Sequence, residues 1–319
     1  MREARGSTLG HPFRPGNTAE GTSECSRHDA KYSLYVNPWL QPEPQSWWGI
    51  VDDATMEDIG SGDVTSGALP PDLVAEWRIE AQGDGVLAGV GIAEYLLAPL
   101  PSESENFEVE VLVADGEAVG RGTVVAQGRA PARRVLAAER TALNFIMHLS
   151  GVATLTREFV RRVDGTNAKI VDTRKTLPML RALQKYAVRC GGGHNHRMGL
   201  YDAAMLKDNH IAAAGSITAA VEAFRATASH MIKLEVECES PEMVEEAIAA
   251  RVDVVLLDNM DPFTMREIVS RHRGKVLFEA SGGIDLDTVR GVAGTGVDII
   301  SVGALTHSAV ALPFHMEFS

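Results

Sequence analysis

The hydrophobic positions of the chain change their spacing about half-way along it. Residues 74–82, 85–90, 107–114 and 122–130 alternate apolar and polar residues between glycine turns, which predicts short strands with one buried face. Residues 91–100 carry a helical pattern, and a helix is also predicted from Trp47 to Asp58. This half of the chain therefore predicts a small domain of mixed helices and strands.

A longer helical pattern follows this domain. Residues 130–163 carry apolar residues at three- and four-residue spacing. Because Ser150 and Gly151 interrupt the pattern, it predicts either one kinked helix or two consecutive helices.

The second half repeats a unit of one apolar strand and one helix. Strand candidates lie at 169–175, 203–210, 231–238, 252–259, 276–283 and 297–304, and helical patterns at 216–228, 240–251, 261–273 and 286–293. Ser240 and Asp261 each stand before a proline, as an N-cap stands before the first helical residue. Nearly continuous apolar strands that alternate with helices are typical of a parallel sheet, and this many units in series predicts an α/β barrel.

Each of these strands has polar residues at its carboxyl end. They are Asp172, Arg174 and Lys175; Lys207, Asp208 and Asn209; Glu235 and Glu237; Asp258 and Asn259; Glu279 and Ser281; and Ser301 and Gly303. Because the active site of an α/β barrel lies at this end of its strands, we expect the six groups to converge on one site.

Composition narrows the class of protein. Of 319 residues, 45% are hydrophobic and 23% charged, as in ordinary soluble proteins, and no apolar run approaches the roughly 20 residues of a membrane span. The net charge of −13 argues against a nucleic-acid partner. Cys25, Cys190 and Cys238 form no metal or disulfide pattern, so we expect packing thiols and a cytoplasmic protein. Residues 1–46 are predicted to be a flexible leader.

The cations of this acidic chain gather between Asp172 and His210. Around the glycines 191–193 this stretch holds Arg174, Lys175, Arg181, Lys185, Arg189, His194, His196, Arg197, Lys207 and His210. Solubility does not require such a cluster, so it predicts a site for a ligand with several negative groups. Arg174, Lys175, Arg197 and Lys207 are the expected binding set, whereas Arg181, Lys185 and Arg189, on a predicted helix at 180–189, are interpreted as solvent-facing.

Two histidines and two acidic residues near the strand ends are less specific. His196 is expected to hydrogen-bond an anionic substrate, while for His194 a structural bond within the glycine loop fits at least as well. Glu237 and Asp258 are each suited to accept ribose hydroxyls, to hold Mg²⁺ or to neutralise the cations as ion-pair partners.

Two glycine-rich turns follow late strands. They are Ser281, Gly282 and Gly283, and Val302, Gly303 and Ala304. Backbone N–H groups in such turns bind phosphate, and the later strands of a barrel are a recurrent place for this. The turns therefore predict a phosphate site.

The stretch VDTRKTLPMLRALQKYAVRCGGGHNHRMGLYDAAMLKDNH resembles the signature region of the quinolinate phosphoribosyltransferase family. The likeness extends to EDIGSGDVTS at 57–66, AERTALN at 138–144, SGVATLTREFV at 150–160, LEVEC at 234–238, LLDNM at 256–260 and EASGGI at 279–284. Together these motifs are highly specific. One departure is Met179, where the family often has glycine, and we expect a local adjustment of the backbone there.

The resemblance implies a fold and a division into domains. It implies a type II phosphoribosyltransferase-like α/β fold, with an N-terminal α/β sandwich domain followed by an incomplete (β/α) barrel of parallel strands. The sandwich domain is expected at 47–150, completed by 306–319, and the barrel at 151–305.

The resemblance also implies an activity, which is the transfer of phosphoribose from phosphoribosyl pyrophosphate to quinolinate. Decarboxylation accompanies the transfer, and the products are nicotinate mononucleotide, pyrophosphate and CO₂, in de novo NAD biosynthesis. Mg²⁺ is the implied cofactor, and the implied assembly is a homodimer with a shared active site, or a higher oligomer.

Residue roles come from the same resemblance. The positions that resemble the family's quinolinate-binding group are Arg140 (from the neighbouring subunit), Arg174, His196, Arg197 and Lys207. Those that resemble its phosphoribosyl pyrophosphate site are Thr173, Lys175, Glu237, Asp258, Ser281, Gly282, Gly283, Val302, Gly303, Ala304 and His307. Lys175, Lys207, Glu237 and Asp258 are the expected catalytic residues, and Glu237 and Asp258 are expected to hold the metal, directly or indirectly.

Two other functions remain open from the residues. In a Schiff-base lyase, Lys207 at a strand end would attack a substrate carbonyl, although the dense anion-binding set is unnecessary for such a substrate. A relative of the same fold with another task, such as those of molybdenum utilisation, or an anion-binding protein without turnover, is the second alternative.

Overall fold

A computed structural model of the chain describes residues 46–98 and 107–318. Most of the expected leader and Cys25 therefore lie outside the described residues. The helices are α1 (Trp48–Ile59), η2 (Ser66–Ala68), α2 (Val90–Leu97), α3 (Ala132–Arg162), α4 (Arg181–Cys190), α5 (Asp208–Ala214), α6 (Ile217–Thr227), α7 (Pro241–Ala249), α8 (Pro262–His272), α9 (Val289–Ala293) and α10 (Ala304–His307). The strands are β1 (Val74–Ala81), β2 (Gly85–Val86), β3 (Glu108–Val111), β4 (Ala118–Val119), β5 (Val124–Pro131), β6 (Lys169–Val171), β7 (Ala204–Leu206), β8 (Leu234–Cys238), β9 (Val254–Asp258), β10 (Leu277–Ser281), β11 (Ile299–Ser301) and β12 (Phe314–Phe318).

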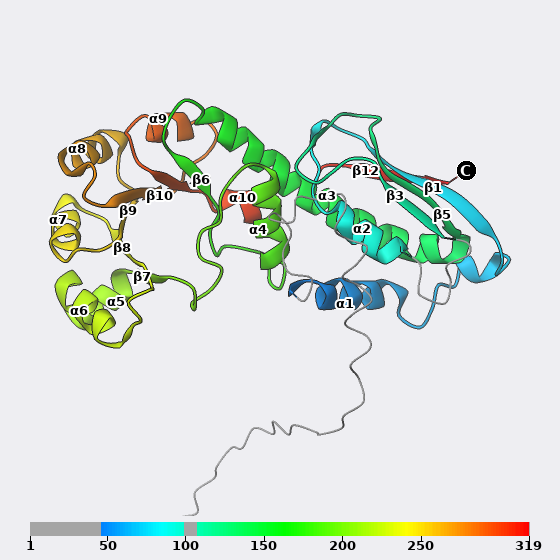
Figure 1. Ribbon diagram of the computed structural model, residues 1–319, viewed down its shortest axis with the longest axis horizontal. Coiled ribbons are helices and arrows are strands. Elements are labelled where there is room, and N and C mark those ends of the chain that lie inside the picture. Colours follow the sequence, from blue (N-terminus) through cyan, green and yellow to red (C-terminus); the bar gives the residue numbers. More distant parts are fainter. Residues whose placement is uncertain (1–45, 99–106, 319) are drawn as a thin grey trace, which may run out of the picture. The chain divides into compact units, whose positions relative to one another are not determined.

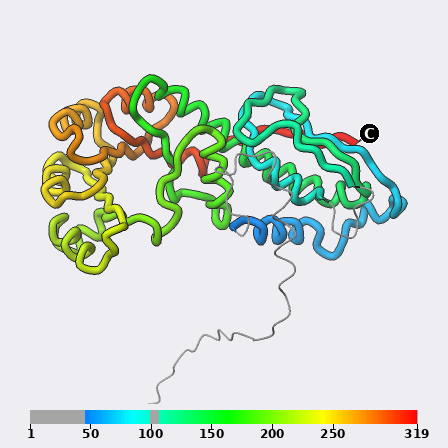
Figure 2. Tube along the Cα trace, in the orientation of Figure 1, coloured from blue at the N-terminus to red at the C-terminus, as the bar shows by residue number. Residues whose placement is uncertain are grey.

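The first half forms an antiparallel sheet that the end of the chain completes. Its strand order is β12-β1-β5-β3, and β12 pairs with β1 so that Ile79 lies opposite Met316 (Figures 1 and 2). Trp77, Ile79 and Ala81 on alternate positions of β1 are buried, as the apolar alternation predicts. Helices α1, α2 and α3 pack together within this half of the chain.

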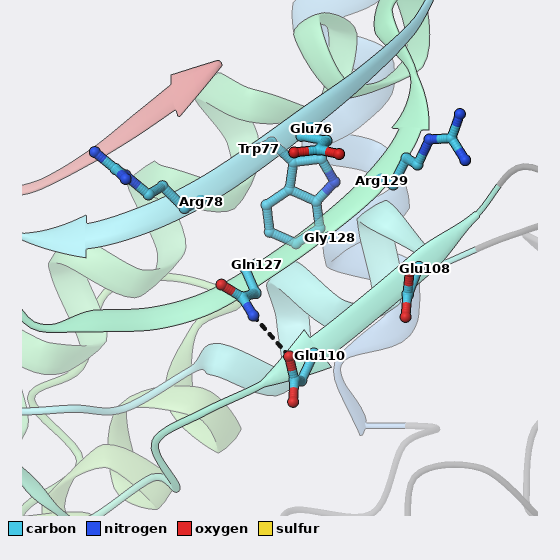
Figure 3. A pocket seen from close by; sticks show the side chains of 8 residues that line it. All are labelled: Glu76, Trp77, Arg78, Glu108, Glu110, Gln127, Gly128 and Arg129. Atoms are coloured by element: carbon cyan, nitrogen blue, oxygen red, sulfur yellow. Dashed lines mark hydrogen bonds between the residues drawn. The ribbon is translucent and has the colours of Figure 1, made fainter. Parts of the chain in front are cut away.

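The outer face of this sheet is hollowed and charged. The hollow is lined by Glu76, Trp77, Arg78, Glu108, Glu110, Gln127, Gly128 and Arg129 (Figure 3). Its groups pair with each other in solvent: Gln127 donates to Glu110 at 2.7 Å, and Arg78 forms an ion pair with the half-exposed Glu317. Charges of both signs describe a solvated surface, and no predicted site residue lines it.

The second half forms a six-stranded parallel sheet in the order β6-β11-β10-β9-β8-β7. Strands β6 and β7 are its edges, so the described barrel is incomplete, as the resemblance implies. On β8, the apolar residues Leu234, Val236 and Cys238 are buried on the side where α7 packs. The alternate residues Glu235 and Glu237 therefore point to the inner face of the sheet.

Helix α3 joins the two halves without a break. It contacts α1, α2 and β12 of one half, and α4, β6 and α9 of the other. Of the two alternatives expected at Ser150 and Gly151, two consecutive helices are wrong, because both residues lie inside one helix. Gly151 is instead required by packing: a Cβ atom there would overlap the carbonyl oxygen of Val310 and lie 3.0 Å from the Cα of Ala311.

Several predicted strands are longer than the observed ones. The strand expected at 203–210 ends at Leu206, and Asp208 already begins α5; the strand expected at 85–90 ends at Val86, four residues before α2 begins at Val90. The predicted caps are confirmed, since Ser240 accepts a hydrogen bond from Met243 N and Asp261 accepts from Phe263 N and Thr264 N. Within residues 46–98 and 107–318, no helix combines the length and the hydrophobicity needed to cross a membrane.

Candidate active site

The predicted site residues, apart from Arg140, lie at or just beyond the carboxyl ends of the parallel strands. Thr173, Arg174 and Lys175 follow β6, Lys207 follows β7, Glu237 lies on β8, and Asp258 and Ser281 end β9 and β10. His196 and Arg197 lie in the loop between α4 and β7, and Gly303 and His307 follow β11. Parallel strands carry these residues to one edge because all their carboxyl ends face the same way.

A buried ion pair between Asp172 and Lys185 organises the loop that carries His196. The two side chains are 0% and 1% exposed. Asp172 also accepts from the backbone N of His196 at 2.9 Å and from Asn195 Nδ2 at 2.5 Å, while Lys185 donates to the carbonyl oxygen of His196 at 2.9 Å. The interpretation of Lys185 as solvent-facing is wrong, because its ammonium group is held between a carboxylate and a carbonyl in the interior.

The neighbouring arginines of α4 are also structural. Arg181 donates to Thr176 Oγ1 and to the carbonyl oxygen of Met198, each at 3.1 Å, and Arg189 donates to Asn195 Oδ1 at 3.2 Å. Neither side chain is fully exposed, so the solvent-facing interpretation is wrong for these two as well. Their role is to tie α4 to the loops that carry the site.

The glycine run 191–193 packs against α3. A Cβ atom at Gly191 or at Gly193 would lie 2.5 Å or 2.8 Å, respectively, from side-chain atoms of Thr156. The backbone of His194 then pairs with β6, since its N donates to the carbonyl oxygen of Ile170 at 2.8 Å and its carbonyl accepts from Asp172 N. These bonds are made by the backbone and join the loop to the β6 segment; the exposed side chain of His194 makes no hydrogen bond to the glycine loop within the described residues.

Two arginine side chains, Arg174 and Arg197, lie close enough near this loop for their charges to interact. Burial, and then the charge of Arg174, lower the pKa of Arg197. Arg197 is held by the carbonyl oxygen of Ala203 at 3.2 Å, whereas Arg174 Nε is buried and has no hydrogen-bond partner among the described residues. Two neighbouring cations with unused donors form a site suited to a carboxylate or phosphate.

The acidic residues of β8 and β9 lie next to a lysine. Lys207 forms an ion pair with Glu237, and Asp258 accepts from Asn259 Nδ2 at 2.8 Å. Glu237 is paired in register with Leu256, so Asp258 is the next residue on the same face of the neighbouring strand. The ion-pair role that the sequence left open for Glu237 is thus observed.

The first of the two glycine turns has a backbone conformation that favours glycine. Gly282 and Gly283 have φ of 102° and 57°, and a Cβ atom at Gly282 would overlap the side-chain amide of Asn259. At Gly303 a Cβ atom would lie 3.1 Å from Lys175 Cδ and 3.2 Å from His307 Nε2. The second turn therefore lies close to two of the side chains predicted for the phosphoribosyl donor, Lys175 and His307.

Beneath these residues lies a cluster that the sequence did not assign. His196 Nε2 lies 3.1 Å from Glu235 Oε2 and 3.5 Å from Glu279 Oε2, and the two glutamates are 6% and 2% exposed. Burial, then the charge of Glu235, raise the pKa of Glu279 to about 8. Burial alone would lower the pKa of His196, but the hydrogen bond to Glu235 and the negative charges that Glu279 and Glu235 carry when both are ionised raise it.

Sequence reasoning placed Glu235 and Glu279 among the polar strand ends but gave them no role. Each lies two residues before a residue with an expected role, namely Glu237 and Ser281. That spacing puts each pair on one face of a strand and is the signal that could have identified them.

Arg140 is not brought to this site within the chain. It is exposed on α3. His148, eight residues further along the same helix, contacts α4, since its Nε2 lies 3.0 Å from Nε2 of Gln184. Eight helical residues span about 12 Å. Among the described residues Arg140 has no hydrogen-bond or ion-pair partner.

Two further expectations are settled locally. Cys190 and Cys238 are buried packing thiols, and burial raises the pKa of Cys238 to about 12. Met179 has φ of 66° and is 80% exposed, so a methionine occupies the left-handed conformation that glycine prefers.

Comparison with known proteins decides the family. The model of the C-terminal domain of quinolinate phosphoribosyl transferase matches residues 152–317, and the model of its N-terminal domain matches residues 63–150. The chain belongs to the quinolinate phosphoribosyltransferase family. The match covers both the antiparallel sheet domain and the parallel sheet that carries the site.

Individual relatives agree with this assignment. A probable nicotinate-nucleotide pyrophosphorylase (carboxylating) of Bacillus subtilis (strain 168) is 46% identical over 82% of this chain and 90% of its own length. A quinolinate phosphoribosyltransferase (decarboxylating) of Nicotiana tabacum, named 2a, mitochondrial, is 38% identical over 96% of this chain and 92% of its own. The solved nicotinate-nucleotide pyrophosphorylase of Francisella tularensis superposes with a TM-score of 0.82 at 37% identity, covering 87% of this chain and 97% of that one.

Proposed function

We propose that this member of the quinolinate phosphoribosyltransferase family transfers phosphoribose from phosphoribosyl pyrophosphate to quinolinate, with decarboxylation, in de novo NAD biosynthesis. The observation that carries the proposal is the pair of neighbouring cations Arg174 and Arg197, in which Arg174 Nε is buried and has no hydrogen-bond partner among the described residues. A pyridine dicarboxylate needs two anion grips, and a planar guanidinium offers each carboxylate a bidentate one.

The reaction explains why the site needs so many cations. The ring nitrogen of quinolinate attacks the anomeric carbon of the donor, and pyrophosphate leaves with the bonding electrons. The ring nitrogen is then positive, so it stabilises the electron pair left at C2 when the bond to CO₂ breaks, and C2 takes up a proton. Lys175 and His307 on either side of Gly303 suit the phosphate groups of the donor.

Mg²⁺ is proposed as the cofactor, held by Glu237 and Asp258. Carboxylate oxygens on neighbouring strands are the ligands that Mg²⁺ prefers, and one or two of them suffice when substrate phosphates and water complete its shell. Because Glu237 is paired with Lys207, its carboxylate already has a cationic partner, which agrees with a metal that arrives with the phosphates. When bound, the ion would neutralise charge on the departing pyrophosphate.

We also propose that the enzyme is a cytoplasmic homodimer with shared active sites. The position of Arg140 supports the dimer, because this unpaired cation of AERTALN lies about 12 Å along α3 from the contact with α4. A second chain that presents its Arg140 to the strand ends would complete the quinolinate grip.

The direct test is turnover with Mg²⁺, quinolinate and phosphoribosyl pyrophosphate, with nicotinate mononucleotide and CO₂ both measured. Arg197→Met should lower kcat/KM for quinolinate about 100-fold, since it removes charge-assisted hydrogen bonds to the substrate. Arg225→Met, on the outer helix α6, is the matched control and should behave as wild type. Nicotinate accepted in place of quinolinate, without release of CO₂, would exclude the decarboxylating reaction.

The Schiff-base alternative is disfavoured by the surroundings of Lys207. The nitrogen of Lys207 is engaged in an ion pair with Glu237, and the cations clustered around the site are unnecessary for a simple carbonyl substrate. Borohydride trapping of a substrate adduct on Lys207 would support the lyase instead.

A further inference from the structure

The cluster of His196, Glu235 and Glu279 has an unusual shortage of partners. The three side chains offer donor and acceptor atoms within 4.8 Å of one another. Glu235 Oε1 and Glu279 Oε1 are both buried and have no hydrogen-bond partner among the described residues. Two buried carboxylates that both kept their charge would repel each other and lack compensation, so the cluster must hold an extra proton or a cation.

The protonation of the His196 ring decides whether the cluster holds a proton or a metal cation. Its Nδ1 accepts a hydrogen bond from the backbone N–H of Arg197 at 2.7 Å, so Nδ1 carries no proton. The ring proton is therefore on Nε2 and points to Glu235 and Glu279. A nitrogen that carries its proton has no lone pair for a metal, and metal-binding histidines usually donate from the other ring nitrogen. The extra charge is therefore balanced by a proton.

The hydrogen bond from Arg197 N–H to His196 Nδ1 also shows which residue carries this proton. A proton on Nδ1 would oppose the N–H of Arg197, so the proton that the two acids attract is not on the ring. Glu279 is the more deeply buried of the two acids, while Glu235 already accepts from His196. Glu279 is therefore the protonated member of the pair.

We propose that Glu279 is a protonated carboxylic acid that donates to the carboxylate of Glu235, and that this singly charged pair acts through His196 as a positioning device for the dicarboxylate substrate. Glu235 holds Nε2–H, and the fixed ring holds the backbone of Arg197, whose charge interacts with that of Arg174. This inference rests on the proposed function, because it assigns positioning residues to the same quinolinate site.

The charge of the pair matters to a dianionic substrate. Glu279 is faced by Glu235 of β8, by Ser301 of β11 and by His196, with Lys185 of α4 nearby and Arg197 close to Glu235. If Glu279 loses its proton, a second negative charge appears under the arginines that bind quinolinate. Quinolinate binding is therefore expected to weaken as the pH rises above about 8, where the pKa of Glu279 lies.

The test compares Glu279→Gln with Glu279→Leu. Glutamine copies the protonated acid, since it donates and carries no charge, so quinolinate KM at pH 7 should stay within about threefold of wild type. Leucine removes the hydrogen bond that Glu279 donates to Glu235. It should raise quinolinate KM about tenfold or more, with the KM for phosphoribosyl pyrophosphate unchanged. Between pH 7 and 9, quinolinate KM should rise for wild type and stay flat for Glu279→Gln.

A matched control is Glu245→Gln, which changes a glutamate paired with a histidine, His272, on an outer helix. It should leave both Michaelis constants and the pH profile unchanged. A Glu279→Gln variant as impaired at pH 7 as Glu279→Leu would overturn the proposal, because it would mean that an ionised Glu279 is needed. An unimpaired Glu279→Leu would overturn it too.

A measurement without turnover separates this inference from the proposed function. In ¹⁵N spectra of the ligand-free protein at pH 7, His196 should be neutral with its proton on Nε2. An imidazolium signal, or the tautomer with the proton on Nδ1, would refute the pair even in an active enzyme. If the expected tautomer were found in a protein that fails to convert quinolinate, the Glu235–Glu279 pair would be supported and quinolinate would be excluded as the substrate.

Discussion

At the scale of single residues, Glu279 should control how stability depends on pH. Burial, and then the charge of Glu235, raise its pKa from 4.5 to about 8. The native state thus keeps a proton that the unfolded chain releases, so stability should be lost as pH rises from about 4.5 to about 8. Glu279→Gln has no proton to lose. Between pH 5 and pH 8 wild type should therefore lose about 2 kcal/mol or more of unfolding free energy relative to Glu279→Gln. Urea denaturation of both proteins at each pH measures this difference.

Glu245→Gln provides the comparison for this experiment. Its hydrogen bond to His272 lowers the pKa of Glu245 from 4.5, so this carboxyl group is already ionised at pH 5 and above. The variant should therefore follow the wild-type pH dependence. Parallel curves for Glu279→Gln and wild type would contradict a buried proton on Glu279.

Lys185 marks the limit of sequence reasoning at this scale. Its neighbours Arg181 and Arg189 and its place on an amphipathic helix favour a solvated lysine, and nothing local reveals that Asp172 will lie against it. The density of cations in this stretch predicts an anionic ligand, but it did not show that Arg181, Lys185 and Arg189 make structural bonds instead. A contact such as that between Lys185 and Asp172 could not be read from the chain, because it forms only when the fold brings the two segments together.

At the scale of elements, Gly151 is expected to matter for packing. Gly151→Ala should improve intrinsic helix propensity, yet the new Cβ would overlap the carbonyl oxygen of Val310. We expect a loss of about 1–3 kcal/mol in the free energy of unfolding, because overpacking outweighs propensity. Thermal and urea denaturation both measure it.

Gly291 is the matched control within a helix. It is exposed in α9, and a Cβ atom there would have no neighbour within 4 Å. Gly291→Ala should therefore be neutral or stabilising by up to about 1 kcal/mol. If Gly151→Ala were also stabilising, the close approach of the segment after α10 would not be a packing constraint.

Most of the elements and their order followed from periodicity, but α5, β12 and several element ends did not. Alternating and three-to-four spacing identified the strands and helices, and the caps at Ser240 and Asp261 placed two helix starts correctly. The apolar pattern of 203–210 continues past Leu206, where the chain instead turns into α5. Strand length is set by hydrogen bonding to neighbours that are distant in sequence, which periodicity does not contain.

At the scale of the whole molecule, the proposed sharing of each active site between two subunits predicts complementation between inactive variants. Arg140→Ala and Lys207→Ala should each be inactive, because each removes a cation from the quinolinate grip. In a heterodimer of the two, one site keeps both residues. Random exchange of subunits should therefore restore roughly a quarter of wild-type activity, half the dimers being mixed and half their sites intact.

Differently tagged chains allow the mixed dimers to be isolated for the assay. Purified heterodimers should reach about half of wild-type turnover. A pairing of Lys207→Ala with Arg197→Ala should give no recovery, since both residues belong to the same chain's strand ends. Inactive heterodimers of Arg140→Ala with Lys207→Ala would place Arg140 outside the site.

The sequence by itself determined the α/β class, the parallel strands with chemistry at their carboxyl ends, the anionic nature of the ligand and, through its motifs, the family. These are properties of residue type and spacing, which local periodicity and side-chain chemistry control. Only the tertiary structure decided that Lys185 is buried against Asp172, that α3 is continuous through Gly151, and that Glu235 and Glu279 meet at His196. Each of these depends on which distant segments come into contact. Burial at such contacts raises the free-energy cost of an ionised side chain and so changes its protonation and its role.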